Sequence, residues 1–397
     1  MMFSQGKTDC TPVEIGYDAD RLHILNKHFH RIIKEKKIQC ASYCITLKGK
    51  VIAHNGIGKQ SFSEDDNRTV GYNAIHYIAS MTKPFVAAAI MKLVEDGFIR
   101  LDQGVCEILP QFKVPPYNQV TLFGLLTHTS GMHPDTGCFP DDKTVSPWEL
   151  IERGYKNHKA EDGEFDWITA SLKNGVRSEP GKEWCYCSYG YTILGAVIEK
   201  ATGIKAETYI EDNICKPLGM VDTTFKFEPN KKDRWIIQNG ARMTKRLLGL
   251  SEDENDATGE EPWSKIPQTA GGLNSTAYDM TIFGNCMLNK GTLNGVRILG
   301  KKAVEKMTAP AIHNIPDYCW GAKTPSRGYG IGFDLRSGPA FTFSNGTFNH
   351  EGSGACAMYV DPAEELAAAW IVPWVNVNEW HGEALWNTLN IIWSGLV

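Results

Sequence analysis

The sequence lacks several features that would point directly to a location. No stretch approaches the roughly 20 apolar residues that a membrane-spanning helix needs. The longest apolar run, 366–375, is interrupted by Pro373. The N-terminus (MMFSQGKTDC) carries a lysine with no apolar segment behind it, so it does not have the pattern of a secretory signal. We therefore expect a cytoplasmic protein without a membrane span.

Positive charge and paired cysteines are also scarce. The chain holds 41 Lys and Arg against 46 Asp and Glu, a net charge of −5, so nucleic acid is not an expected partner. None of the 11 cysteines forms a CxxC pair, and Cys40/Cys44 and Cys185/Cys187 lack zinc-site spacing. We expect buried, reduced thiols and neither a metal nor an organic cofactor. The motifs GxSxG, HExxH, GxxxxGK[ST] and GxGxxG are missing too.

The apolar periodicity predicts an α/β domain built from both ends of the chain, 1–100 plus 271–397, around a mostly helical domain, 101–270. An acid-rich segment, 251–261, is expected to be an exposed loop. Helices are predicted at 20–37, 80–96, 192–201, 276–288 and 379–393. Strands are predicted at 40–47, 51–55, 329–335, 341–343, 355–360 and 366–372.

Ser80-Met81-Thr82-Lys83 is an S-x-x-K motif in a context that gives it geometry. Pro84 is tolerated only in the first turn of a helix, which places Ser80 at the helix N-terminus. Residues three apart share a helix face, so the Lys83 amine can reach the Ser80 hydroxyl, and a desolvated lysine can lose its proton near neutral pH. The alternative is an N-cap serine followed by a surface lysine. A second match, Ser4-Gln5-Gly6-Lys7, lies in a polar tail and is expected to be coincidental.

Two further segments contain candidate functional residues. In PGKEWCYCSYGY (180–191), a tyrosine held beside a lysine can carry a lowered pKa and relay protons. In Asn349-His350-Glu351-Gly352-Ser353-Gly354, the glycines before a predicted strand allow a close approach of backbone to a ligand. Taken alone, each segment is also compatible with a purely structural role.

In this order, the three segments resemble the serine β-lactamase-like superfamily, and within it the class C-type branch of β-lactamases, D-stereospecific peptidases, esterases and transesterases. The similarity extends over residues 80 to about 360, and its combination of segments is highly specific. It rests on SMTKPFVAAAIMKLVEDG (80–97), LLTHTSGM (125–132), PGKEWCYCSYGYTILGAVIEKATG (180–203), PLGMVDTTF (217–225), GGLNSTAYDM (271–280) and YGIGFDL (329–335).

The resemblance implies an α+β fold, with an antiparallel sheet flanked by helices, an inserted helical domain and the active site between them. It implies that Ser80 is the acylated nucleophile, that Lys83 is its proton-transfer partner, and that Tyr186 is a general base and proton relay. His350, Glu351 and Gly352 take the third-motif position. The backbone N–H groups of Ser80 and Ser353 would form the oxyanion hole, and Ser188 would face the substrate.

Two departures from the family pattern bear on the substrate. Tyr-x-Asn becomes Tyr186-Cys187-Ser188, which removes an amide that helps to position the lysine. Lys-Thr-Gly becomes His350-Glu351-Gly352, which replaces a carboxylate-binding cation and adds an acid that we expect near the cleft mouth. Both changes favour a neutral ester or amide over a β-lactam.

The resulting hypothesis is an esterase or transesterase that acts on a small-molecule ester through an acyl-serine. Its alternatives are a β-lactamase or D-stereospecific peptidase of the same superfamily and a non-catalytic scaffold protein on the same fold. Four tryptophans, Trp320, Trp370, Trp374 and Trp380, hint at an apolar acyl group. The oligomeric state is left open.

Overall fold

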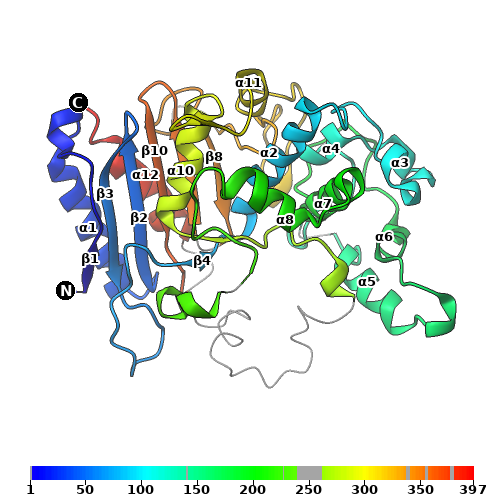
Figure 1. Cartoon of the computed structure of the whole chain (residues 1–397), viewed down its shortest axis with the longest axis horizontal. Helices are drawn as coiled ribbons and strands as arrows, with labels where there is room; N and C mark the ends of the chain where they lie inside the picture. The colour runs from blue at the N-terminus through cyan, green and yellow to red at the C-terminus, as the bar shows by residue number, and fades with distance from the viewer. Residues whose placement is uncertain are drawn as a thin grey trace.

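The computed structural model describes residues 2–139, 142–226, 228–238, 262–336, 340–353, 356–375 and 380–397. A six-stranded antiparallel sheet occupies the left half of the molecule in Figure 1, and α3 to α7, within residues 105–202, lie on the right. Chain segments from both ends supply its strands, and β2 pairs with β10 across more than 300 intervening residues. In spatial order the strands are β1 (Phe3–Gln5), β3 (Lys50–Gly58), β2 (Cys40–Leu47), β10 (Leu366–Ile371), β9 (Cys356–Asp361) and β8 (Phe348–Gly352).

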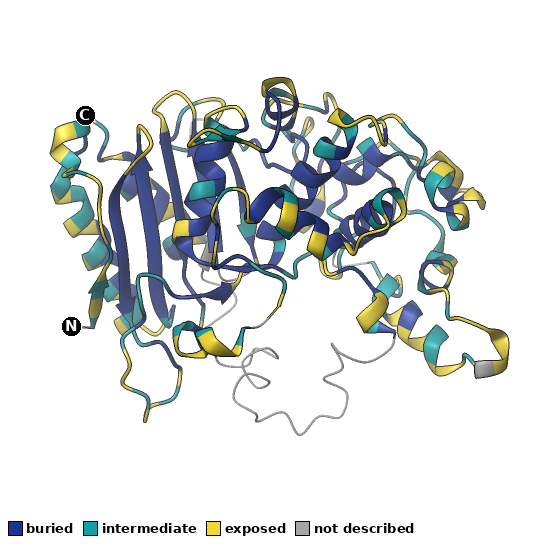
Figure 2. Cartoon of the chain, in the orientation of Figure 1, coloured by how far each residue is buried: buried dark blue, intermediate teal, exposed yellow. Residues whose placement is uncertain are grey.

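Helices cover both faces of this sheet, so its central strands are buried from end to end (Figure 2). One face packs against α1 (Ala19–Lys34) and α12 (Thr388–Trp393). The other face packs against α10 (Ala277–Leu288), and α2 (Thr82–Glu95) belongs to the same apolar core. The predicted α+β fold, an antiparallel sheet flanked by helices, is confirmed. The division of the chain into 1–100 plus 271–397 and 101–270 stays a prediction.

Between β3 and β8 the chain forms helices of different lengths and two small two-stranded sheets, one of which joins distant segments. The remaining α-helices are α3 (Val105–Ile108), α4 (Leu122–Leu126), α5 (Pro147–Lys156), α6 (Trp167–Ser171), α7 (Ser188–Thr202), α8 (Ala206–Ile210) and α11 (Lys301–Met307). β4 (His76–Tyr77) pairs with β5 (Asn274–Ser275), and β6 (Thr292–Leu293) pairs with β7 (Val296–Arg297). Single 3₁₀ turns lie at Pro12–Ile15, Ala79–Met81, Pro110–Lys113, Tyr117–Gln119, Ala160–Asp162, Leu172–Asn174, Pro229–Arg234, Trp263–Lys265 and Cys319–Gly321, and π-helical turns at Glu211–Cys215 and Trp380–Asn387.

Two predicted strands are wrong. The 329–335 segment folds into a tight turn, in which the Gly330 N–H donates to the Phe333 carbonyl at 2.9 Å and Gly332 adopts φ +77°. Its β-pairing is reduced to isolated bridges, between Tyr329 and Asp334 and between Asp334 and Asn349 of β8. The 341–343 segment is irregular, and its two phenylalanine rings stack on each other with centroids 5.0 Å apart. The apolar residues of both segments are therefore used for packing rather than for a strand ladder. The predicted acidic loop, 251–261, lies outside the described residues.

Most of the cysteines are buried, reduced thiols, as expected from the sequence. All 11 cysteines are free thiols, and nine of them are buried. Among the described helices, none combines the length and the apolar character needed to cross a membrane.

Candidate active site

Ser80 lies in the 3₁₀ turn that leads directly into α2. The turn is fastened on both sides to the segment before β5: the Ile78 N–H donates to the Leu273 carbonyl at 2.9 Å, and the Leu273 N–H donates to Thr82 Oγ1 at 3.1 Å. Ala79 adopts φ +46°, a left-handed conformation that costs a non-glycine residue about 1 kcal/mol or more. The backbone that carries Ser80 is therefore kept in a strained conformation by the hydrogen bonds on either side of it.

Lys83 is completely buried, and three oxygen atoms surround its amine. Nζ lies 3.0 Å from Ser80 Oγ, 3.1 Å from Ser188 Oγ and 2.8 Å from the Ala270 carbonyl oxygen. Burial lowers the pKa of Lys83 from 10.5 to about 8, and nearby Asp135 acts in the opposite direction. About a tenth of this lysine is therefore neutral at pH 7 and about half at pH 8. The contact with Ser80 is the one that the S-x-x-K spacing predicted.

Tyr186 shares a hydrogen bond with Ser80, and its ring centroid lies 5.0 Å from Lys83 Nζ. Burial raises the pKa of Tyr186 well above 10, and the negative charge of Asp135 raises it further. The hydrogen bond to Ser80 only partly opposes this shift. The predicted lowering of the Tyr186 pKa is therefore wrong, because desolvation outweighs its hydrogen bond to Ser80, and the side chain is a neutral phenol.

His128 packs against the ring of Tyr186, and there was no reason in the sequence to select it. Its ring lies 4.5 Å from the Tyr186 ring, centroid to centroid, and its Nδ1 accepts the Cys187 N–H at 3.1 Å. Burial lowers the pKa of His128 well below 6.5, so the ring is neutral. His128 lies within LLTHTSGM (125–132), but the neighbouring residues in the sequence do not indicate that it contacts a tyrosine 58 residues away.

β8 brings the third predicted segment beside the Ser80 turn. A Cβ atom on Gly352 would lie 2.2 Å from the Ile78 carbonyl oxygen, so only glycine permits this approach. Ser353 follows at the end of the strand and is exposed. His350 is buried, its Nδ1 contacts the Glu351 carbonyl oxygen at 2.8 Å, and burial together with the charge of Lys83 lowers its pKa to about 3. The imidazole at this position is therefore uncharged near neutral pH.

Glu351 does not line the site, and this corrects the expectation that its charge lies near the cleft mouth. Adjacent residues on a strand point to opposite faces of the sheet. His350 pairs with Met358, whose side chain belongs to the core between the sheet and α2 and α10. Glu351 accepts a hydrogen bond from the Tyr359 hydroxyl at 2.6 Å, and Tyr359 belongs to the core on the opposite face, beside α1 and α12. An ion pair with Arg336 at 3.3 Å compensates its charge.

Ser188 stands where the family pattern has an amide, and its hydroxyl contacts Lys83 at 3.1 Å. It begins α7, and its Oγ also lies 2.5 Å from Asp135 Oδ2. The sequence reading missed Asp135, which lies in the irregular segment between α4 and α5 and has no periodic or motif signal. The structure thus brings Ser80, Lys83, Tyr186, Ser188 and Asp135 into one contact network, with His350 close enough to sense the charge of Lys83.

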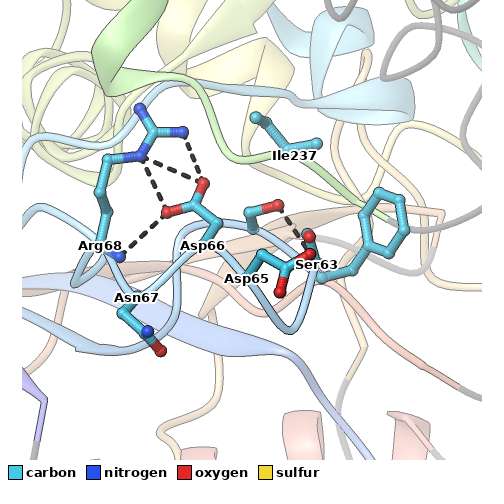
Figure 3. A pocket seen from close by; sticks show the side chains of 8 residues that line it. Ser63, Asp65, Asp66, Asn67, Arg68 and Ile237 are labelled. Carbon is cyan, nitrogen blue, oxygen red and sulfur yellow. Dashed lines mark hydrogen bonds and ion pairs between the residues drawn. The ribbon is translucent and has the colours of Figure 1, made fainter.

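A separate surface hollow of about 750 Å³ lies elsewhere, lined by residues of the 61–68 segment and by Ile237. Figure 3 shows that one of its two acidic side chains, Asp66, forms an ion pair with Arg68. None of the site residues lines it. Within the described ranges, no three or more His, Cys, Asp or Glu side chains are arranged to hold a metal ion.

Comparison with known proteins places this geometry in context. A family model described as Beta-lactamase matches residues 25–386. A Salmonella heidelberg protein named "Putative D-alanyl-D-alanine carboxypeptidase" is 24% identical over 91% of this chain and 84% of its own length. Two solved structures share the fold. A family VIII carboxylesterase has a TM-score of 0.71, 18% identity and coverage of 96% of this chain and 99% of its own. EstCE1, described as a hydrolase with promiscuous acyltransferase activity, has a TM-score of 0.73, 18% identity and coverage of 94% and 99%.

Proposed function

Because this chain belongs to the beta-lactamase family of serine hydrolases, we propose that it cleaves or transfers small carboxylic esters through an acyl intermediate on Ser80. The observation that carries the proposal is the buried Lys83 amine, 3.0 Å from Ser80 Oγ and with a pKa near 8. A serine hydroxyl is a weak nucleophile unless a neighbouring base takes its proton. Neutral Lys83 is that base.

The reaction begins when Lys83 Nζ takes the Ser80 proton and Oγ attacks the ester carbonyl. The negative charge that develops on the carbonyl oxygen is stabilised by the N–H groups of Ser80 and Ser353. The carbon–oxygen bond to the alcohol then breaks, and the Tyr186 phenol, which is bonded to Ser80, donates its proton to the departing oxygen while Lys83 returns one to Tyr186. Water or a second alcohol attacks the acyl-Ser80 by the reverse sequence.

The expected pH dependence follows from Lys83. Below its pKa the lysine is an ammonium ion and cannot accept a proton, so kcat/KM for an uncharged ester should rise as pH increases through about 8 and then level off. Initial rates with p-nitrophenyl butyrate from mildly acidic to mildly alkaline pH, corrected for spontaneous hydrolysis, measure this limb. A profile that is flat across this range would rule out Lys83 as the base.

A neutral substrate is favoured by the side chains that surround the site. His350 stands where β-lactamases of the family usually carry a lysine, and its imidazole is uncharged, so it does not supply a cation for a substrate carboxylate. Trp320 is 60% exposed and its ring lies 5.5 Å from the Tyr186 ring, which suits an apolar or aromatic group on the ester. Trp370, in contrast, is buried in the core on the α1 and α12 side of the sheet.

A carboxypeptidase acting on peptides that end in D-alanine is the second candidate, because it is the activity in the name of the Salmonella relative. The two candidates differ in the charge of the substrate. We expect a burst and steady turnover with p-nitrophenyl butyrate, and neither stable labelling by a fluorescent penicillin nor release of D-alanine from a peptide ending in D-Ala-D-Ala. Faster acylation by the penicillin than by the ester would favour the peptidase.

A further inference from the structure

We propose that Asp135 is a positioning residue that acts through the Ser188 hydroxyl to direct the lone pair of Lys83 at Ser80, an inference that rests on the proposed function. Asp135 lies in the segment between α4 and α5, Ser188 begins α7, and Lys83 lies in the first turn of α2. The three side chains therefore come from separate parts of the chain and meet only in the folded protein.

Asp135 holds Ser188 with both carboxylate oxygens. Oδ1 accepts the Ser188 backbone N–H at 2.6 Å, and Oδ2 accepts the Ser188 hydroxyl at 2.5 Å. The Asp135 N–H in turn donates to the Tyr186 carbonyl oxygen at 2.9 Å. This two-point contact fixes the first turn of α7 and, with it, the orientation of the Ser188 hydroxyl.

A count of hydrogens shows what this orientation does. A carboxylate only accepts, so the single hydroxyl hydrogen of Ser188 points at Asp135, and Ser188 can only accept from Lys83. The Ala270 carbonyl, 2.8 Å from Nζ, also only accepts. Neutral Lys83 has two hydrogens and one lone pair, and these two acceptors take both hydrogens. The lone pair is left facing Ser80, which is the arrangement that proton abstraction requires.

Asp135 also provides the negative charge that faces the amine after Lys83 has taken the proton. The other titratable groups around Lys83 are the Cys187 thiol, the phenols of Tyr186 and Tyr191, and the two imidazoles His128 and His350. Burial raises the pKa of Cys187 to about 12 and lowers those of both histidines, so all of these side chains are neutral. The Asp135 carboxylate is therefore the group that stabilises the ammonium form.

Asp135→Asn tests the proposal, because an amide offers one acceptor oxygen in place of two and carries no charge. We expect kcat/KM for p-nitrophenyl butyrate to fall on the order of 10- to 100-fold. We also expect its rising limb to move to lower pH, by about one pH unit, because the charge that favours the ammonium form is gone. Asp142→Asn, a nearby acid paired with Arg177, should change neither quantity.

Ser188 variants keep the test decisive if Asp135→Asn folds poorly, which thermal unfolding of each variant would show. Ser188→Ala should reduce kcat/KM by a similar factor, and Ser188→Thr, which keeps the hydroxyl, should restore most of it. In Ser188→Ala, the further change Asp135→Asn should cost little, since the two residues act as one unit. Fully additive losses, or a limb that stays in place in Asp135→Asn, would overturn the proposal. Absence of a burst in the unaltered protein would instead contradict the proposed function.

Discussion

Ser80→Ala should reduce kcat for p-nitrophenyl butyrate by about 10⁴-fold or more, because the proposed reaction passes through a covalent bond to Ser80 Oγ. The same change should abolish the mass increase that an activated ester or a phosphonate probe produces. The fold should persist, since alanine occupies less space than serine and the Ser80 turn is held by the backbone bonds of Ile78 and Leu273. Stopped-flow measurement of the burst and intact-protein mass spectrometry check both expectations.

The chain contains a matched control for this substitution. Ser4 is the first residue of the second S-x-x-K match, but it lies in β1, at the edge of the sheet, where its hydroxyl donates to the Val70 carbonyl at 2.8 Å. Ser4→Ala should therefore keep full turnover and full labelling. If Ser80→Ala retained turnover within tenfold of the unaltered protein, the nucleophile would have to be another residue.

The parts of the site that the sequence predicted correctly depend on short-range geometry. Ser80 and Lys83 are three residues apart at a helix start marked by Pro84, and the helix itself brings the two side chains together. Many of the strand and helix positions near both ends were predicted for the same reason, because a strong apolar period specifies an element without reference to distant residues. The short edge strands β1 and β8 have no such period and were not predicted. Gly352 was also marked by its local context.

The parts that failed depend on burial and on contacts between distant segments. The Tyr186 prediction considered a neighbouring lysine, whereas the direction of the pKa shift is decided by desolvation, which a sequence does not reveal. Asp135 meets Ser188 across 53 residues, through an irregular segment without a pattern. Glu351 failed for a related reason. The sequence predicted a strand only from residue 355, so 349–352 was not recognised as part of β8. The alternation that turns Glu351 and His350 to opposite faces became visible only with that strand.

Lys83→Met should separate catalysis from stability, because it removes the base and also relieves a buried charge. Acylation of Ser80 should slow by about 10³-fold or more, and the rising limb near pH 8 should disappear. Methionine has a similar length and helix propensity, so α2 should be unaffected. Lys92→Met, at a partly exposed position of α2 paired with Asp96, is the control and should keep both the rate and the limb.

The stability of the same variant should move in the opposite direction. The lysine pKa falls from 10.5 to about 8 on folding, a difference that corresponds to about 3 kcal/mol of lost unfolding free energy at neutral pH. A group whose folded pKa is lowered in this way binds its proton more tightly when unfolded, so the penalty is complete below pH 8 and vanishes above about 10.5. Lys83→Met should therefore unfold at a higher urea concentration than the unaltered protein at pH 7. The gain in unfolding free energy is at most about 3 kcal/mol, and it is reduced by the cost of leaving Ser188 Oγ and the Ala270 carbonyl without a donor. The advantage should shrink as pH rises toward 10. If Lys83→Met is less stable than the unaltered protein at pH 7, or if its gain in unfolding free energy does not change with pH, then the burial of Lys83 does not destabilise the fold.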